Sequence, residues 1–239
     1  MRLSVVIPCY NEEGRLMPTL TKILAFLKAR KISFEIIVVD DGSKDSTPGL
    51  VRAMMRKEKS LRLAGDGLNH GKGHAVRLGV EAAKGEQILF SDADLSTPIE
   101  EYLALAAALS PQVSLAIGSR ALRGARITRH QPLYRELAGR FFNTMVRLIT
   151  LSGISDTQCG FKLFKADAAR RIFALQRIPR FGFDVEALYL AKKFGYGIAQ
   201  CPVAWENSPE TKVRPIRDGA RTFLDLALIR IYDLMGSYR

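Results

Sequence analysis

Residues 87–94 read QILFSDAD, an apolar stretch typical of a buried strand, followed at once by two aspartates one residue apart. Alternate residues of a strand point to the same side, so Asp92 and Asp94 can both reach one cation, and they can also converge on it if the strand breaks into a loop. Mg²⁺ and Mn²⁺ prefer such oxygen ligands and leave places free for substrate phosphates. Aspartates after a strand more often cap a helix or shape a turn, so the interpretation depends on the surrounding segments.

The surrounding segments repeat this form. Apolar runs predict further strands over 3–7 (ended by Pro8), 34–39, 61–64 and 113–117, and helices are predicted over 19–30, from 48 with Ser46 or Thr47 as its cap, over 74–84 and over 98–109. Strands alternating with helices at short intervals predict an α/β fold with a mostly parallel sheet flanked by helices. Ligands of such sheets bind beyond the carboxyl ends of the strands. Polar clusters follow four strand ends, at 9–12, 40–42, 92–94 and 118–120, so we expect them to share one edge.

Charge and cysteine content narrow the range of partners. The chain of 239 residues carries 36 Lys and Arg against 24 Asp and Glu, a formal net charge of +12, which favours an anionic partner: a nucleic acid, a lipid surface or a phosphorylated substrate. No zinc-finger, RNP-type or basic-zipper pattern is present, so we expect no nucleic acid. Cys9, Cys159 and Cys201 are widely spaced and odd in number, which is typical of a reduced, intracellular chain without disulfides or a zinc cluster.

Two apolar segments in the C-terminal half carry arginines at intervals. Residues 137–149 and 221–232 have helical character, and each could be a core helix or an amphipathic helix in a membrane interface with its arginines at the head groups. The positive charge favours the interface for 137–149. No window reaches 18 apolar residues without a charge and the N-terminus lacks a signal-peptide pattern, so we expect peripheral membrane contact only.

The chain resembles the family 2 inverting glycosyltransferases of GT-A fold in the order and spacing of four motifs: VVIPCYNEE (5–13), VVDDGSKDST (38–47), GKG (71–73) and DAD (92–94). Four later motifs are similar to the branch that acts on polyprenyl and dolichyl phosphates: DLSTP (94–98), GSR (118–120), DTQCGFKLF (156–164) and FDVE (183–186). The resemblance implies a single domain over 1–239, in which 1–120 bind the nucleotide sugar and 121–239 form the acceptor-binding and membrane-interface half.

The resemblance also implies roles at the nucleotide-sugar site. Pro8, Tyr10, Glu12 and Asp41 would line the nucleoside pocket, with Asp41 accepting a hydrogen bond from the base; Asp40 suits a turn. Glycine lets the backbone approach a ligand closely, so Gly73 fits a diphosphate or ribose contact to which Lys72 adds charge, although the segment could be a plain loop. Asp92 and Asp94, on either side of Ala93, would hold Mg²⁺ or Mn²⁺ on the diphosphate.

The acceptor site follows from the chemistry of a phosphate monoester. Its second pKa of about 6 leaves it largely ionised at neutral pH, so the nucleophile needs positioning rather than a strong base. Arg120 and Arg135 could hold it through charge-assisted bidentate bonds, whereas Arg126 and Arg129 suit solvated or lipid-facing positions.

Four residues of the later motifs complete the expected site. Asp156 and Gln158 are expected near the sugar or the metal. Asp184 could contact the sugar, or with Glu186 simply begin a helix; we place Asp184 with Asp92, Asp94 and Arg120 in the catalytic group and leave Glu186 structural.

These expectations describe a hexosyltransferase on the cytoplasmic face of a membrane. The donor favoured by the resemblance is UDP-glucose, and the product is a β-linked polyprenyl or dolichyl phosphate sugar. GDP-mannose and UDP-N-acetylglucosamine are the alternative donors. The alternative from a different class is a non-catalytic nucleotide or nucleic-acid-binding protein.

Overall fold

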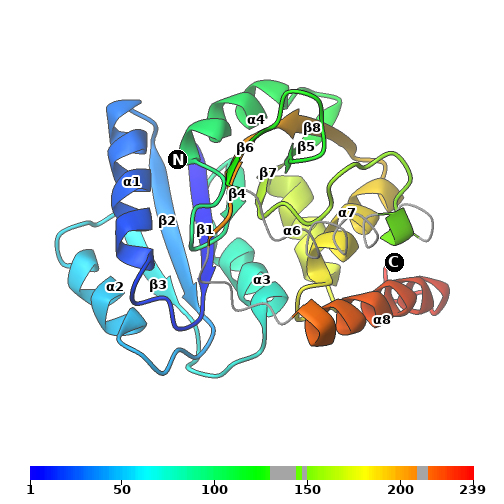
Figure 1. Cartoon of the computed structure of the whole chain (residues 1–239), viewed down its shortest axis with the longest axis horizontal. Helices are drawn as coiled ribbons and strands as arrows, with labels where there is room; N and C mark the ends of the chain where they lie inside the picture. The colour runs from blue at the N-terminus through cyan, green and yellow to red at the C-terminus, as the bar shows by residue number, and fades with distance from the viewer. Residues whose placement is uncertain (130–143, 147–149, 209–214) are drawn as a thin grey trace.

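A computed structural model describes residues 1–129, 144–146, 150–208 and 215–239 (Figure 1). Within these residues, seven strands form one sheet in the order β3-β2-β1-β4-β7-β5-β8. Their bounds are β1 (Leu3–Cys9), β2 (Phe34–Asp40), β3 (Leu61–Ala64), β4 (Gln87–Ser91), β5 (Val113–Ser119), β7 (Phe161–Lys165) and β8 (Gly197–Pro202). A second sheet pairs β6 (Arg126–Arg129) with β9 (Ala204–Glu206).

Helices cover both faces of the main sheet. They are α1 (Leu16–Ala29), α2 (Thr47–Met55), α3 (Lys72–Ala82), the short η1 (Ile99–Glu101), α4 (Tyr102–Ala108), α6 (Ala166–Leu175), α7 (Phe183–Lys193) and α8 (Pro215–Leu234). In β1, Val5 and Ile7 pack in the core shared with α1, α2 and α4, whereas Val6 packs in the core shared with α3, α6 and α7. Because both faces are covered, the strands are continuous apolar runs, and the predicted α/β fold is confirmed.

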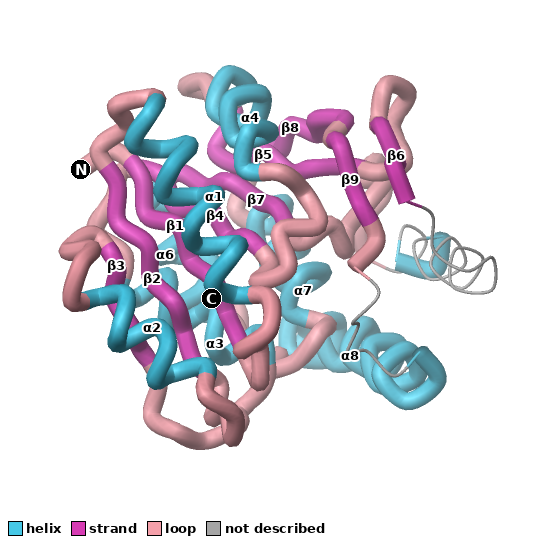
Figure 2. The backbone as a smooth tube through the Cα atoms, turned by 60° about the vertical axis from the view of Figure 1, so that its left-hand side comes forward, coloured by secondary structure: helices cyan, strands magenta, loops and turns pink. Residues whose placement is uncertain are grey.

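The strand directions bring the polar clusters together. β1, β2, β4 and β5 lie parallel by way of their pairings, and only β7 runs antiparallel, between β4 and β5. The carboxyl ends of the four parallel strands therefore meet at one edge, as expected from the sequence. Figure 2 shows the strands of the sheet side by side, with α8 at the periphery, away from α1 and α2.

The prediction that Pro8 ends the first strand is wrong: β1 continues through Pro8 to Cys9. The Cys9 carbonyl accepts a hydrogen bond from the Asp41 N–H at 2.9 Å, so the backbone of Cys9 faces β2 and that of Pro8, one residue earlier, faces β4. The ladder between β1 and β4 ends at Val6 and Phe90. The N–H that proline lacks therefore has no ladder bond to make there, and the strand tolerates the residue.

Helix starts differ from the predicted ones because side chains and glycines serve tertiary contacts. α1 begins three residues before Thr19, and α3 begins at Lys72 rather than His74, directly after Gly71 in the left-handed region at φ 109°. The predicted capping at α2 is wrong: no side chain caps this helix, and the Thr47 hydroxyl instead accepts the Glu12 N–H at 2.8 Å.

The predicted C-terminal helices have different outcomes. The helix expected over 221–232 is confirmed and extends over all of α8. The one expected over 137–149 lies outside the described residues except for helical residues 144–146. In the part of the chain that the structure describes, no helix is long and apolar enough to cross a bilayer.

Candidate active site

The DAD segment leaves the sheet in a tight turn. The Asp92 N–H still donates to the Gly160 carbonyl at 3.1 Å, but the Leu95 N–H turns back to the Asp92 carbonyl at 3.2 Å, and Leu95 has φ 49°. The Asp94 carboxylate accepts the Ser96 N–H at 3.0 Å, which fixes the turn. Of the two geometries that the sequence allows, the structure therefore has the broken strand, with both carboxylates at the sheet edge.

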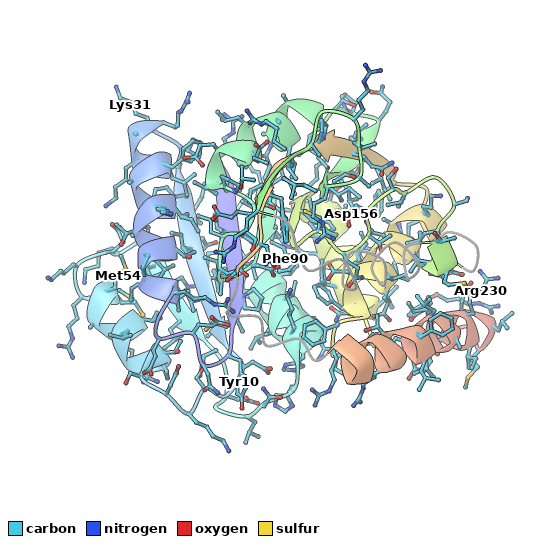
Figure 3. All side chains as sticks on the ribbon, viewed as in Figure 1. Tyr10, Lys31, Met54, Phe90, Asp156 and Arg230 are labelled. Atoms are coloured by element: carbon cyan, nitrogen blue, oxygen red, sulfur yellow. The ribbon has the colours of Figure 1, made fainter. Side chains whose placement is uncertain are left out.

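Lys72 lies against this pair. Its Nζ is 2.6 Å from Asp92 Oδ1, and the side chain also passes over the Phe90 ring, labelled at the centre of Figure 3, at 5.2 Å from the ring centroid. The residue is at the first position of α3, whose N-terminus points to the same edge. Lys72 thus lies where the sequence predicted a positive charge beside a diphosphate.

The glycines on either side of Lys72 leave room for neighbouring protein backbone. A Cβ at Gly73 would lie 2.6 Å from the Ile178 carbonyl oxygen, and one at Gly71 would lie 2.5 Å from that of Pro179. Both glycines therefore let α3 approach the chain segment 178–183, which leads into α7. Protein atoms fill the space that a Cβ of Gly73 would enter, and the predicted contact between Gly73 and a ligand stays a prediction.

A buried ion pair between Lys162 and Asp184, which the sequence analysis did not predict, lies at the inner side of the site. Lys162, in the middle of β7, is 1% exposed, and its Nζ donates to Asp184 Oδ1 at 2.5 Å and to the Cys159 carbonyl at 2.6 Å. Asp184 begins α7, as predicted, and is itself 4% exposed. A lysine between apolar residues inside the strand FKLFK was the available sequence signal, because a charged side chain in a central strand needs a buried partner.

Electrostatics tie these groups into one cluster. Burial raises the pKa of Asp94, and the negative charge of Asp92 raises it further. Burial also raises the pKa of Asp184, against the opposing effect of Lys162 and Lys72. Burial alone would lower the pKa of Lys72, but the carboxylates of Asp92 and Asp184 outweigh it and the pKa is raised. The partly exposed carboxylates of Asp92 and Asp94 lie at the open end of the cluster, where their oxygens can reach a cation.

The residues present fit a divalent cation that arrives with a diphosphate. Asp92 and Asp94 are adjacent carboxylates whose side chains are 32% and 20% exposed, so both stay accessible. Among the described residues, no group of three or more His, Cys, Asp or Glu side chains could hold a metal alone. Mg²⁺ commonly binds through one or two carboxylates together with substrate phosphates and water, which is the donor set found here.

Arg120 is fixed by Asp156. The Asp156 carboxylate accepts the Arg120 backbone N–H at 2.9 Å, the Nε–H at 2.7 Å and an Nη2–H at 2.8 Å. Burial alone would raise the pKa of Asp156, but the guanidinium holds it below its usual value. Asp156 thus positions Arg120, and its expected place near the sugar or the metal stays a prediction; the remaining guanidinium N–H groups are left for a phosphate.

The other residues expected at the acceptor end have separate outcomes. The Gln158 backbone N–H donates to Asp156 Oδ1 at 3.2 Å, and its side-chain Nε2 is buried without a hydrogen-bond partner among the described residues. This free donor agrees with a sugar contact for Gln158. Arg135 lies outside the described residues. Glu186 accepts the N–H groups of Arg177 and Ile178, both at 2.8 Å, which is a structural role, as expected.

At the nucleoside end, Asp41 is engaged by its own loop. Its carboxylate accepts the His70 N–H at 2.8 Å, the Gly71 N–H at 3.0 Å and the Asn69 side-chain amide at 2.9 Å. Burial raises the pKa of Asp41 although the two backbone N–H groups oppose it. Asp41 therefore joins the end of β2 to the start of α3, and its bond to a base stays a prediction. Asp40 accepts the Ser43 N–H, as expected of a turn residue.

Arg15 links the nucleoside end to the metal pair, and the sequence analysis missed it. It forms an ion pair with Glu12, and its Nη1 lies 3.7 Å from Asp94 Oδ2. Tyr10 is half-buried just beyond β1 (Figure 3), while Pro8 and Ala93 are buried. The structure thus gathers Glu12, Lys72, Asp92, Asp94 and Asp184 at one edge, with Arg120 close enough for Asp92 to influence its charge.

Gly160 limits the space behind Asp92. A Cβ at Gly160 would lie 1.9 Å from Asp92 Oδ2, although the backbone there is not in the left-handed region. We expect Gly160→Ala to push the Asp92 carboxylate away from Lys72 and to lower turnover about 100-fold, since ångström-scale displacement of a catalytic group costs about that much. Gly49→Ala is the matched control, because a Cβ there meets nothing within 4 Å. Equal activity of the two variants would show that the position of Asp92 is unimportant.

Comparison with known proteins gives a consistent result. The model described as Glycosyl transferase family 2 matches residues 4–173. A dolichyl-phosphate beta-glucosyltransferase of Homo sapiens is 37% identical over 251 residues, covering 100% of this chain and 78% of that protein. One of Saccharomyces cerevisiae is 34% identical over 255 residues, covering 99% of this chain and 76% of that protein.

Solved structures show the same fold. Mannosyl-3-phosphoglycerate synthase from Rubrobacter xylanophilus superposes with a TM-score of 0.72 at 17% identity, covering 99% of this chain and 75% of that one. Glucosyl-3-phosphoglycerate synthase from Mycobacterium tuberculosis, in complex with Mn²⁺, UDP and glucosyl-3-phosphoglycerate, has a TM-score of 0.66 at 20% identity, covering 94% of this chain and 79% of that one. At these identities the likeness establishes the arrangement of helices and strands.

Proposed function

The chain belongs to glycosyl transferase family 2, and from that premise we propose that it transfers glucose from UDP-glucose to dolichyl phosphate or a related polyprenyl phosphate. Relatives that carry the name dolichyl-phosphate beta-glucosyltransferase match it along nearly its whole length. The observation that carries the proposal is that residues suited to bind a metal and a residue suited to bind a phosphate lie at the same edge of the sheet. An accessible pair of carboxylates, Asp92 and Asp94, lies near an arginine, Arg120, that a buried carboxylate holds ready for a phosphate.

The proposed reaction is a direct displacement. A phosphate oxygen of the acceptor forms a bond to C1 of glucose as the bond from C1 to the UDP oxygen breaks, so the anomeric centre inverts and the product is β-linked. Arg120 binds and orients the acceptor phosphate with N–H groups that Asp156 leaves free. No residue has to remove a proton, since the phosphate is already ionised at neutral pH. Asp184, held by Lys162, contributes position and charge rather than basicity.

Mg²⁺ or Mn²⁺ would be held by Asp92 and Asp94 and would neutralise charge that develops on the departing diphosphate. Lys72, the only cation within ion-pair distance of Asp92 among the described residues, keeps that carboxylate in place. The Mn²⁺ and UDP in the complex of the fold relative support this choice of metal.

The test is a donor and metal screen with one lipid acceptor. With dolichyl phosphate in detergent, UDP-glucose and Mn²⁺ or Mg²⁺, we expect an acid-labile glucosyl lipid and stoichiometric UDP, both abolished by EDTA. GDP-mannose and UDP-N-acetylglucosamine are run in parallel, and a larger kcat/KM for either would replace glucose as the sugar. Binding of a nucleotide sugar without any lipid product from the three donors would favour the non-catalytic alternative.

α8 supports peripheral membrane contact as the site of this reaction. Its outward side chains are largely apolar: Phe223, Leu224, Leu228, Ile231 and Leu234, together with Met235 just after the helix, are all at least 37% exposed. Leu226 and Ile229 on the opposite side are buried in the core. Exposed Arg221 and Arg230, the second of which is labelled in Figure 3, flank the apolar face in the helical order of the sequence, as expected for a helix lying in an interface with arginines at the head groups. We place this contact on the cytoplasmic face, in keeping with three free cysteines.

Vesicle flotation tests this contact. Leu224→Ser/Leu228→Ser is expected to weaken binding to phosphatidylcholine vesicles about 30-fold, because each of the two exposed leucines loses burial in the bilayer worth roughly 1 kcal/mol. Leu68→Ser/Leu103→Ser is the matched control, since these leucines are as exposed but lie away from α8. Equal flotation of the two double variants would remove α8 from the membrane contact.

A further inference from the structure

A second polar cavity lies between α3, α6 and α8, outside the residues of the active site. It has a volume of about 370 Å³, and it is lined by Arg77, Ala174, Leu175, Gln176, Arg177 and Tyr232. Arg77 comes from α3, Tyr232 from α8, and the other four from the end of α6 and the residues that follow. The volume lies within the range of small-molecule sites, and none of the groups assigned above to glucosyl transfer lines it.

The two arginines of this cavity lack strong acidic partners. Arg77 Nε is 3.8 Å from Glu81 Oε1, near the limit of an ion pair, and its Nη1 donates weakly to the Gln176 carbonyl at 3.4 Å. Among the described residues no carboxylate pairs with the Arg177 guanidinium, which is 5.9 Å from the centroid of the Tyr232 ring and donates to the Ser237 carbonyl at 3.5 Å. Two guanidinium groups with so few partners favour an anion, and arginine suits the oxygens of a phosphate.

Gln176 adds a neutral acceptor to the two charges. The residue is 4% exposed, and its Nε2 donates to the Ile178 carbonyl at 2.8 Å, which fixes the amide orientation. Its Oε1 is buried and has no hydrogen-bond partner within the described ranges. A buried acceptor without a donor costs free energy, and a small movement of the amide that opens Oε1 to the cavity would let a ligand hydroxyl donate to it and remove that cost. Phosphate and hydroxyl together define the chemistry.

The cavity also opens beside the apolar face of α8. Tyr232, in its wall, lies one helical turn from Leu228, which belongs to that face. If the face contacts a bilayer, as proposed, the cavity is at the depth of the lipid head groups. We propose that this cavity binds a phosphate ester that carries a free hydroxyl, either the glycerol phosphate head group of an anionic lipid or a soluble glycerol phosphate. Only the lipid source rests on the proposed function.

Binding of the full-length protein at low salt tests the site without measuring glucosyl transfer. Calorimetry with glycerol 3-phosphate reports the soluble source, and flotation with vesicles of phosphatidylcholine, with or without phosphatidylglycerol, reports the lipid source. Arg77→Gln/Arg177→Gln is expected to lose at least tenfold in affinity for one or both probes. Arg52→Gln/Arg56→Gln is the matched control: it removes the same charge from exposed positions in α2 and directly after it, at the opposite side of the molecule from α8 (Figure 1), and should change affinity less than twofold.

Further measurements keep the outcome decisive. Gln176→Ala is expected to reduce the preference of the wild-type protein for glycerol 3-phosphate over methyl phosphate, which has no hydroxyl, by about fivefold. Loss of phosphatidylglycerol binding alone would assign the lipid source, and loss of glycerol phosphate binding alone the soluble source. Equal losses in the pocket and control variants, or no binding of either probe by the wild type, would overturn the site. Glucosyl transfer by the pocket variant in detergent tests the proposed function separately.

Discussion

Asp94→Asn is expected to lower the kcat/KM of lipid glucosylation about 1000-fold in the presence of Mn²⁺, equivalent to about 4 kcal/mol of transition-state stabilisation. The change removes one of the two accessible carboxylates at the sheet edge while keeping the size of the side chain and its acceptor for the Ser96 N–H. The remaining pair, Asp92 and Lys72, is neutral overall, so the attraction for a divalent cation falls. The decisive measurements are initial rates over a Mn²⁺ titration and the affinity for Mn²⁺ in the presence of UDP.

The same variant should not be less stable than the wild type. The pKa of Asp94 is raised in the folded chain, by burial and by Asp92, above the ordinary value of 3.8. The folded state then binds the proton more tightly than the unfolded state, so the free energy of unfolding decreases as pH rises through the interval above 3.8. A neutral asparagine removes this cost at pH 7. Asp167→Asn, at an exposed acid of α6, is the control; a 1000-fold loss there, or full activity in Asp94→Asn, would contradict the metal assignment.

Lys162→Met is expected to lower the free energy of unfolding by about 3–5 kcal/mol, the usual cost of leaving one partner of a buried ion pair alone. Lys162 and Asp184 are 1% and 4% exposed and only 2.5 Å apart, so solvent cannot replace the lost ammonium. Burial would then raise the pKa of Asp184 further, and the deficit should be smaller at pH 5 than at pH 8, because the protonated acid carries no charge. Urea denaturation at both values of pH measures this.

A double variant separates the ion pair from the strand that carries it. Lys162→Met/Asp184→Asn should recover more than half of the lost stability, since no buried charge is left unpaired. It should not recover turnover, because the charge of Asp184 belongs to the cluster around Lys72 and Asp92. Lys22→Met, at an exposed position of α1, is the control and should change stability by less than about 0.5 kcal/mol. A double variant as unstable as the single one would mean that Lys162 acts through packing alone.

The sequence predicted the strands and helices that a local hydrophobic pattern indicates. It did not predict contacts between residues that lie far apart along the chain. Apolar runs identified five strands, of which the edge strand β3 is only partly buried, and their shared direction placed the polar clusters at one edge. The direction and place of β7 were not predictable, since FKLFK reads the same whether it pairs parallel or antiparallel. The boundary at Pro8 failed for a similar reason: whether a proline is tolerated depends on the strand beside it.

Site residues divide in the same way. Asp92, Asp94 and Lys72 follow strand ends or open a helix, so their place at the edge could be predicted from order along the chain. The partnership of Arg120 with Asp156 joins residues 36 positions apart, and single-residue patterns gave Asp156 to the sugar or metal instead. Arg15 had no visible signal, because its two acidic partners come from different loops.

The position of β7 between β4 and β5 has a consequence for how the chain folds as it leaves the ribosome. Residues 1–119 contain the five strands β1 to β5, but β4 and β5 cannot join in one sheet until residues 161–165 of β7 have been made. Until then the nascent sheet ends in an open β4 edge, the kind of surface that recruits other strands. Once DTQCGFKLF has been synthesised, β7 can pair with β4 and cover this edge. The same segment brings Asp156 to Arg120 and places Lys162 where Asp184 can later pair with it. The nucleotide half is therefore expected to need residues 161–165 of the acceptor half in order to complete its sheet.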